Sequence, residues 1–332
     1  MAQPTEVPTA VTEAAAISVR GLVKRYGQIT AVDGIDLDVQ PGEIFGFLGP
    51  NGAGKSTTIK ILCTLVPATS GSARVAGHDV RTERDAVRRN IGLVFQEPTL
   101  DGYLTAEQNL RFHCELYGMP RAVARARREE VLAMVSLLDR RWDLVQTYSG
   151  GMKRRLEIAR GLLHSPRVLF LDEPTIGLDV TMQSRIRRFV AEYNRRTGAT
   201  ILLTSHYMDD VVALCRRVIV IHHGHLLYDG GLADLAERMA PYKLIRVTLR
   251  DAVIGMPLER YGEPIEREGN QVTLKVARVE APERIARLVQ DLGGQVLDLT
   301  LEDPAIEAVI DRVFSSAEVT LAAEASTAAA RS

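Results

Sequence analysis

The segment Gly49-Pro50-Asn51-Gly52-Ala53-Gly54-Lys55-Ser56 decides the fold, because it fits the pattern G-x-x-x-x-G-K-[ST]. It follows the run Ile44–Leu48, which is apolar on both faces like a central parallel strand, and it precedes a helical pattern from Lys55 to about Val66. Glycines let successive backbone N–H groups converge on an anion, and a helix N-terminus adds partial positive charge. The order of strand, loop and helix therefore predicts a phosphate-binding loop. In such a loop Lys55 reaches the β- and γ-phosphates and Ser56 binds Mg²⁺.

Strand and helix patterns alternate around this loop. Strand-like runs occupy 91–95, 168–171, 200–204 and 218–222, with helical patterns between them. This alternation predicts a layered α/β domain with a parallel sheet. The alternating pattern from residue 17 to 39 predicts strands at a sheet edge. Residues 98–163 show no strand pattern, and Thr105 with Gln108 forms a capping box, so we expect an inserted helical subdomain there.

The pattern changes after Pro241. Alternating apolar residues at 245–249, 272–276 and 297–301 predict strands, and apolar stripes at 285–292 and 306–313 predict helices. We therefore expect a main domain over 16–240 and a small α+β domain over 241–315. The Ala-, Thr- and Pro-rich residues 1–15 and the segment 316–332 are typical of a disordered leader and tail.

Composition limits the classes of function. The 332 residues carry 41 Lys+Arg and 42 Asp+Glu, a net charge of −1, so no strong positive field attracts the chain to nucleic acid, and we expect no such partner. The sequence holds no uninterrupted apolar stretch of the roughly 18 residues that a membrane-spanning helix needs. Cys63, Cys114 and Cys215 lack metal or redox spacing, so we interpret them as buried thiols.

A second polar cluster follows the strand at 168–171. Asp172 ends this strand, where its carboxylate would suit a Mg²⁺ shell beside the phosphate loop. Glu173 follows directly and is a candidate base to polarise an attacking water. An Asp-Glu pair alone is more often a solvated turn. The phosphate loop earlier in the chain makes the functional interpretation the better one.

Three further motifs complete an ordered series. Ser149-Gly150-Gly151 opens a helix and can form a second anion site, Gly177-Leu178-Asp179 follows Asp-Glu-Pro, and Ser205-His206 follows the next strand. From about Ile17 to Leu235 the chain thereby resembles the ATP-binding subunits of ABC transporters. The resemblance implies a P-loop NTPase with a RecA-like parallel sheet, an antiparallel β subdomain and an inserted α-helical subdomain, extended here by the small C-terminal α+β domain.

The resemblance also implies roles for residues that the pattern alone leaves open. ATP would bind the segment 49–57, which comprises Gly49, Pro50, Asn51, Gly52, Ala53, Gly54, Lys55, Ser56 and Thr57. Tyr26 would stack on adenine, and Gln96 would touch Mg²⁺ or the water and face the membrane subunit. His206 would contact the γ-phosphate, and Asp179 would lie in the loop that crosses to a second ATP-binding subunit.

The same resemblance implies the partners. Ser149, Gly150 and Gly151 would close over the nucleotide of a second copy of the chain, so that ATP binding forms a homodimer. The family's usual Leu and Gln at the two ends of this signature are replaced by Tyr148 and Met152. The implied cofactors are ATP and Mg²⁺. The implied location is the cytoplasmic face of the membrane, as a peripheral subunit of a separate multi-helix permease.

One cassette followed by a small extension, with Leu301-Glu302-Asp303 near its end, is similar to the daunorubicin-resistance type of exporter ATPases. The resemblance implies export, with drugs as the leading substrate and lipids or polysaccharides as alternatives. An import system is a further possibility. A soluble ABC-type ATPase acting on nucleic acid or ribosomes is the alternative from another class, and a P-loop metabolic kinase would leave Ser149–Gly151 and His206 unexplained.

Overall fold

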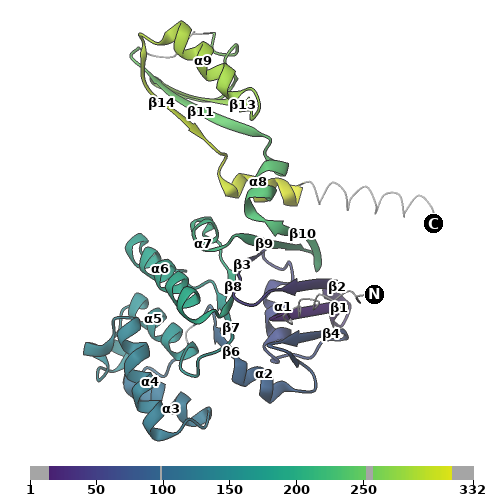
Figure 1. Cartoon of the computed structure of the whole chain (residues 1–332), viewed down its shortest axis with the longest axis vertical. Coiled ribbons are helices and arrows are strands. Elements are labelled where there is room, and N and C mark those ends of the chain that lie inside the picture. The colour runs from purple at the N-terminus through teal and green to yellow at the C-terminus, as the bar shows by residue number, and fades with distance from the viewer. Residues whose placement is uncertain (1–14, 98, 252–256, 316–332) are drawn as a thin grey trace, which may run out of the picture. The chain divides into compact units, whose positions relative to one another are not determined.

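A computed structural model of the chain describes residues 15–97, 99–251 and 257–315 (Figure 1). The expected leader, apart from residue 15, and the expected tail lie outside these residues. The chain divides into two compact units between Asp229 and Gly230, earlier than the change of pattern at residue 241. The two units are described separately.

The first unit is built on a six-stranded sheet of order β10-β9-β3-β8-β7-β6. Strand β3 pairs in parallel with β8 and β9, and β7 pairs in parallel with β6 and β8. The strands are β3 (Ile44–Leu48), β6 (Ile91–Val94), β7 (Val168–Asp172), β8 (Thr200–Thr204), β9 (Arg217–His222) and β10 (His225–Gly231). Since parallel strands end at the same sheet edge, the segments after β3, β6, β7 and β8 come together there.

An antiparallel sheet of order β2-β1-β4-β5 forms the second layer, from β1 (Ile17–Tyr26), β2 (Ile29–Val39), β4 (Ser70–Val75) and β5 (His78–Asp79). Helix α1 (Lys55–Leu62) shares one buried core with both sheets. Thr64 has a φ of 63°, outside the helical region, so α1 ends before the expected Val66. The sheets and α1 confirm the predicted P-loop NTPase fold.

Helices cover the other side of the six-stranded sheet, where Figure 1 shows α5 and α6 opposite α1. The inserted segment contains α3 (Ala106–Leu116), α4 (Arg121–Met134), α5 (Gly150–Gly161) and the 3₁₀ turns Leu138–Arg140 and Val145–Thr147. The predicted capping box is present, since Thr105 and Gln108 each accept the other's backbone N–H. The remaining helices of this unit are α2 (Arg84–Asn90), α6 (Val180–Thr197) and α7 (Met208–Leu214).

The second unit contains an antiparallel sheet of order β12-β13-β11-β14 with α9 packed into its core. Its elements are α8 (Leu232–Met239), β11 (Tyr242–Leu249), β12 (Glu263–Glu268), β13 (Gln271–Ala277), α9 (Ala281–Leu292) and β14 (Val296–Glu302). Residues 306–315 are helical, and from them Arg312 donates to the carbonyl oxygen of Met239 at 3.2 Å. Helix α8 therefore belongs to the second unit. In the described ranges of both units, no helix combines the length and apolarity needed to cross a membrane.

Candidate functional site

The phosphate loop follows β3, and its glycines are required by close approaches. A Cβ on Gly49 would lie 2.3 Å from the carbonyl oxygen of Ile221, and one on Gly54 would lie 2.4 Å from that of Ala31. Gly54 also has a φ of 110°, which L side chains rarely adopt. The loop is thus held tightly against β9 and β2, and its backbone can curve around an anion without side chains in the way.

Lys55 begins α1 and turns back over this loop. Its Nζ donates to the carbonyl oxygens of Gly49 at 2.5 Å and Pro50 at 3.0 Å. Burial lowers the pKa of Lys55, while the carboxylates of Glu173 and Asp172 act in the opposite direction. A partly buried cation above a glycine loop fits the phosphate chain of a nucleotide, with the two carboxylates nearby.

The carboxylate of Asp172 is fixed by the neighbouring strand. Thr204 lies opposite Asp172 in the parallel β7–β8 pair, and its hydroxyl donates to Asp172 Oδ1 at 2.6 Å. The main-chain N–H of Glu173 donates to both the hydroxyl and the carbonyl oxygen of Thr204, each at 3.1 Å. Thr204, which the sequence patterns did not single out, therefore orients both acidic residues.

Glu173 is where the predicted catalytic residues meet. Only 8% of it is exposed, and its backbone has a φ of 50°, uncommon for a residue other than glycine. Its Oε1 lies 3.0 Å from Nε2 of His206, and its Oε2 accepts from Nε2 of Gln96 at 3.4 Å. The carboxylate thus joins three segments that are far apart in the sequence, and it can receive a proton from a water held beside it.

Arg154 on α5, which the sequence analysis did not identify, supports the main chain around Asp172 and Glu173. Its guanidinium donates to the main-chain oxygens of Asp172, Glu173 and Pro174, each at 2.8 Å, and also to that of Phe95. Burial lowers the pKa of Arg154, which is only 6% exposed. One buried cation therefore satisfies four carbonyl groups next to the candidate base.

A second buried charge organises the segments after β7 and β8. Asp210 has no exposed surface, forms an ion pair with Arg187 at 3.0 Å and accepts from Ser205 Oγ at 2.9 Å. It also accepts from the hydroxyl of Thr175. Ser205 precedes His206 and Thr175 follows the Glu173-Pro174 pair, so Asp210 positions both sides of the cluster. In the sequence, Asp210 was distinguished only by its position four residues after His206.

The signature segment lies at the start of α5, beside the start of α6. Ser149 caps α5 by accepting from the N–H of Met152 at 3.3 Å, and Asp179 caps α6 by accepting from that of Met182 at 2.9 Å. A Cβ on Gly151 would lie 3.3 Å from Cγ of Met182, whereas one on Gly150 would meet open space. Among the described residues, no hydrogen bond joins Ser149–Gly151 or Asp179 to the phosphate loop of the same chain.

The structure also describes the surroundings of Tyr26 and Tyr148. Tyr26 ends β1 and is 46% exposed, with Lys24 Nζ 4.7 Å from the centre of its ring. Tyr148 is buried, and its hydroxyl donates to the carbonyl oxygen of Arg140 at 2.7 Å. Tyr148, which stands where the family usually has Leu, is therefore directed into the helical insertion, while Ser149 and Gly150 remain exposed.

A phosphate loop between a parallel strand and a helix, with an Asp-Glu pair and a His at the ends of neighbouring strands, defines a P-loop nucleoside triphosphatase. The comparisons with known proteins narrow this class. Residues 32–176 match the family model for the ABC transporter, and residues 241–302 match that for the EvrA-like ABC transporter, C-terminal domain. The chain belongs to the ATP-binding proteins of the ABC transporter family and is an ABC-type ATPase, as the resemblance of its motifs predicts.

Individual relatives agree. The daunorubicin/doxorubicin resistance ATP-binding protein DrrA of Streptomyces peucetius is 40% identical over 289 residues, which cover 86% of this chain and 87% of that protein. The solved structure of cbiO1 from Clostridium perfringens, part of the ABC transporter complex cbiONQ, matches with a TM-score of 0.63 and 29% identity. That match covers 68% of this chain and 92% of cbiO1. A dimeric post-hydrolysis state of the ATP-binding cassette MJ0796 with ADP and Pi has a TM-score of 0.59 at 26% identity, covering 65% and 98%.

Proposed function

We propose that this ATPase powers drug export through a separate membrane permease, at the cytoplasmic face of the membrane. The observation that carries the proposal is the extent of the similarity to the Streptomyces peucetius resistance protein, which covers 86% of this chain. Such a match includes sequence beyond the cassette. A cassette-only likeness would be compatible with any substrate of the family.

The assigned roles follow from the geometry of the loop. The backbone of 49–57 and the ammonium of Lys55 would hold the phosphates, and Ser56, Gln96 and Asp172 would hold Mg²⁺. A hydroxyl, an amide oxygen and a carboxylate are the oxygen donors that this ion prefers. When bound, Mg²⁺ neutralises charge on the phosphate oxygens. Thr204 keeps Asp172 in one orientation for this task through its hydrogen bond of 2.6 Å.

Glu173 would accept the proton of the attacking water. Its buried carboxylate has two oxygens directed by different partners, His206 and Gln96, which fixes the plane of the group. Arg154 prevents the main chain at Glu173 from relaxing, because it holds the carbonyl oxygens on both sides of that residue. His206 is half exposed and can turn from Glu173 toward a γ-phosphate.

Two surfaces would meet partners. The exposed Ser149 and Gly150, with Asp179 beside them, would face the nucleotide of a second copy. The exposed ring of Tyr26 would contact the adenine of the chain's own nucleotide.

The second surface is a groove of about 600 Å³ beside Phe95, next to Gln96. It is lined in part by the exposed side chains of Leu65 and Leu116. Apolar exposure next to a catalytic segment favours this groove as the permease contact.

The test is transport in a host that lacks the system. The chain is expressed with and without a candidate multi-helix permease of an ABC exporter, and intracellular daunorubicin is followed by its fluorescence. We expect lower accumulation only when both proteins are present, and none of this effect with Glu173→Gln. Unchanged accumulation of daunorubicin together with ATP-dependent movement of a lipid or saccharide would overturn the drug assignment and leave the ATPase assignment intact.

A further inference from the structure

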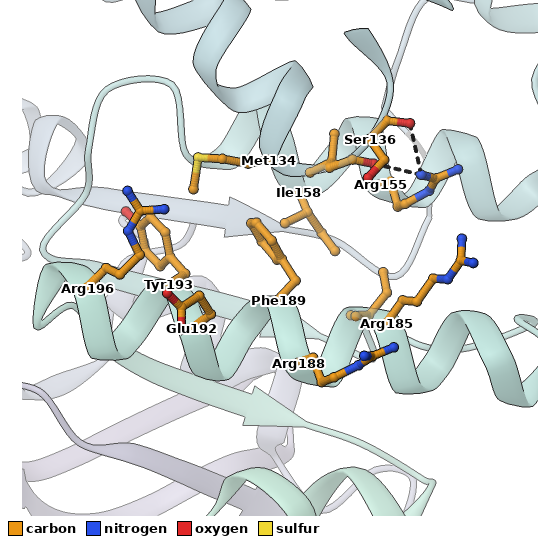
Figure 2. A pocket seen from close by; sticks show the side chains of 12 residues that line it. Met134, Ser136, Arg155, Ile158, Arg185, Arg188, Phe189, Glu192, Tyr193 and Arg196 are labelled. Carbon is orange, nitrogen blue, oxygen red and sulfur yellow. Dashed lines mark hydrogen bonds between the residues drawn. The ribbon is translucent and has the colours of Figure 1, made fainter. Parts of the chain in front are cut away.

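A pocket of about 580 Å³ lies in the first unit, away from the phosphate loop (Figure 2). It is formed by the end of α4, the middle of α5 and the middle of α6. Its apolar lining consists of Met134, Val135, Ile158, Ile186, Phe189 and Tyr193. Figure 2 shows Phe189 projecting from α6 toward Ile158. The volume and the lining are in the range of small-molecule sites in proteins.

The charged groups around this apolar lining are almost all positive. They are Arg155, Arg185, Arg188 and Arg196, against a single acid, Glu192. Glu192 is already engaged, since it forms an ion pair with Arg195 at 2.7 Å. Throughout the described ranges, Arg185, Arg188 and Arg196 have no ion pair with any carboxylate. The pocket therefore carries a net positive charge around an apolar floor.

Among these arginines, Arg155 is held in place by hydrogen bonds to the main chain. Its Nη1 donates to the carbonyl oxygens of Val135 at 2.7 Å and Ser136 at 3.2 Å, which ties α5 to the end of α4. Its pKa is lowered by burial and next by the positive charge of Arg185. Like charges gathered without counterions raise the free energy of the pocket, and a bound anion would relieve that repulsion.

We propose that this pocket binds a soluble amphiphilic anion: a molecule with a compact apolar body, such as one or two rings, and a carboxylate, phosphate or sulfonate group. The apolar body would contact Phe189 and Ile158. The anionic group would lie against Arg185 and Arg188, whose guanidinium groups suit planar or tetrahedral oxyanions. The concave shape and the apolar floor favour a small molecule over a flat charged surface.

The position of the pocket gives the ligand access to the catalytic machinery. Helix α5 starts at the Ser149 cap and carries Arg154 next to Arg155, and α6 starts at the Asp179 cap. A ligand held between the two helices would therefore contact both elements that present the signature segment and its neighbour. The binding proposal itself does not depend on which substrate the transporter exports.

Calorimetry on the full chain tests the proposal with two probes that share one apolar body. Naphthalene-2-sulfonate is the anion, and 2-naphthylmethylammonium is its cationic counterpart. We expect saturable binding of the sulfonate and at least tenfold weaker binding of the cation, because the lining is positive. Equal affinity for the two probes would overturn the proposal.

Variants locate the binding. Arg185→Glu combined with Arg188→Glu should weaken binding of the sulfonate about tenfold or more, since two attractive charges become repulsive. Phe189→Ala should weaken it severalfold through lost apolar contact. Arg121→Glu combined with Arg125→Glu is the matched control, because these two exposed arginines lie on α4 and do not line the pocket. Circular dichroism and the melting temperature establish that each variant is folded.

Other outcomes count against the pocket. Sulfonate binding at the phosphate loop would be unaffected by the reversal at 185 and 188 and would be lost in Lys55→Ala, which would overturn the assignment. Sedimentation with phosphatidylglycerol vesicles separates a lipid surface from a free ligand. If only vesicles bind, and they bind through Arg185 and Arg188, the soluble ligand is wrong and a membrane headgroup takes its place.

Discussion

The guanidinium of Arg154 donates to the main-chain oxygen of Glu173 at 2.8 Å, so a residue of the signature helix directly supports the candidate base. The same Nη2 atom also donates to the carbonyl oxygen of Asp172, and Nη1 donates to that of Phe95, next to Gln96. The helix that presents Ser149 is therefore bonded to both the carboxylate strand and the Gln96 segment. A displacement of α5 would therefore move the main chain at Glu173 through Arg154.

We expect Arg154→Met to lower both stability and turnover. The substitution keeps the apolar length but removes a donor from four carbonyl groups, of which that of Glu173 still accepts from the N–H of Ile176 at 3.3 Å. At roughly 1–3 kcal/mol for each unsatisfied group, the cost should be about 3 kcal/mol or more after partial rehydration. Turnover should fall at least tenfold, because the backbone at Glu173 has a φ of 50° and needs external support. Urea unfolding and steady-state ATPase kinetics measure the two effects.

Arg154→Lys and Lys153→Met separate support of the base from general destabilisation. Lysine retains the charge but cannot reach several carbonyls in the fixed fork of a guanidinium, so kcat should fall with little change of KM for ATP. Lys153 is the neighbouring cation, and its ammonium makes no hydrogen bond or ion pair in the described structure, so removing the ammonium should leave stability and turnover unchanged. A kcat unchanged in Arg154→Lys would show that the arginine only stabilises the fold.

Lys55→Ala should abolish most ATP binding. The ammonium is the cation placed over the loop, and removing the partner of a partly buried charge typically costs about 3–5 kcal/mol. The carbonyl oxygens of Gly49 and Pro50 can be hydrated in the variant, so the fold should survive. Calorimetric titration with ATP measures the loss. Lys60→Ala, an exposed position on the same helix, is the control, and wild-type affinity in Lys55→Ala would remove this loop from the nucleotide site.

The sequence predicted those parts of the site whose chemistry depends on a local pattern. The phosphate loop, Asp172 and Glu173 follow buried strands, and strands end where apolar runs stop. Arg154 and Asp210 could not be found in this way. Among the described residues, the Arg154 guanidinium hydrogen-bonds only to main-chain oxygens, which any sequence supplies. In the sequence alone, Arg154 cannot be told from Arg155 beside it. Asp210 is joined to Arg187, 23 positions away, through the packing of α6 on α7.

The same reasoning applies to the fold. Parallel strands such as β3 and β7 are buried on both faces and stand out as apolar runs. Strand β12 has the sequence Glu263-Pro264-Ile265-Glu266-Arg267-Glu268. Among the described strands it pairs only with β13, and its mostly polar sequence gave no strand signal. The two units divide between Asp229 and Gly230, earlier than the change of apolar pattern at residue 241. Helix α8 belongs to the second unit through Arg312, a contact that periodicity does not encode.

Asp210→Asn should destabilise the protein and slow hydrolysis. Asparagine keeps the shape, but Arg187 loses the only carboxylate with which it forms an ion pair in the described residues. Breaking one side of a buried pair typically costs about 3–5 kcal/mol, and the hydroxyls of Ser205 and Thr175 lose their charged acceptor. The melting temperature and ATPase rate should both fall. Asp209→Asn, the exposed neighbour, is the control, and equal effects from both would argue against a special role for Asp210.

Glu173→Gln should preserve ATP binding but reduce turnover by about 10²–10⁴, the usual contribution of a general base. The amide keeps the volume and can still accept one hydrogen bond from Gln96 or His206, so the surrounding geometry should persist. It cannot take up the proton of the attacking water. Single-turnover kinetics distinguish this loss of chemistry from slow product release.

The same variant tests the proposed dimer. If Ser149 and Gly150 close over the nucleotide of a second copy, a variant that holds ATP without hydrolysing it should accumulate as a dimer in light scattering. Glu97→Gln changes an exposed acid directly after Gln96 and should behave as the wild type. Adding Ser149→Arg to Glu173→Gln should then prevent dimerisation without weakening ATP binding, because Ser149 would face the partner's nucleotide. The melting temperature separates this effect from the loss of the cap on α5. If Glu173→Gln stays monomeric at saturating ATP, both alone and with the permease, then the signature segment does not close on a second copy.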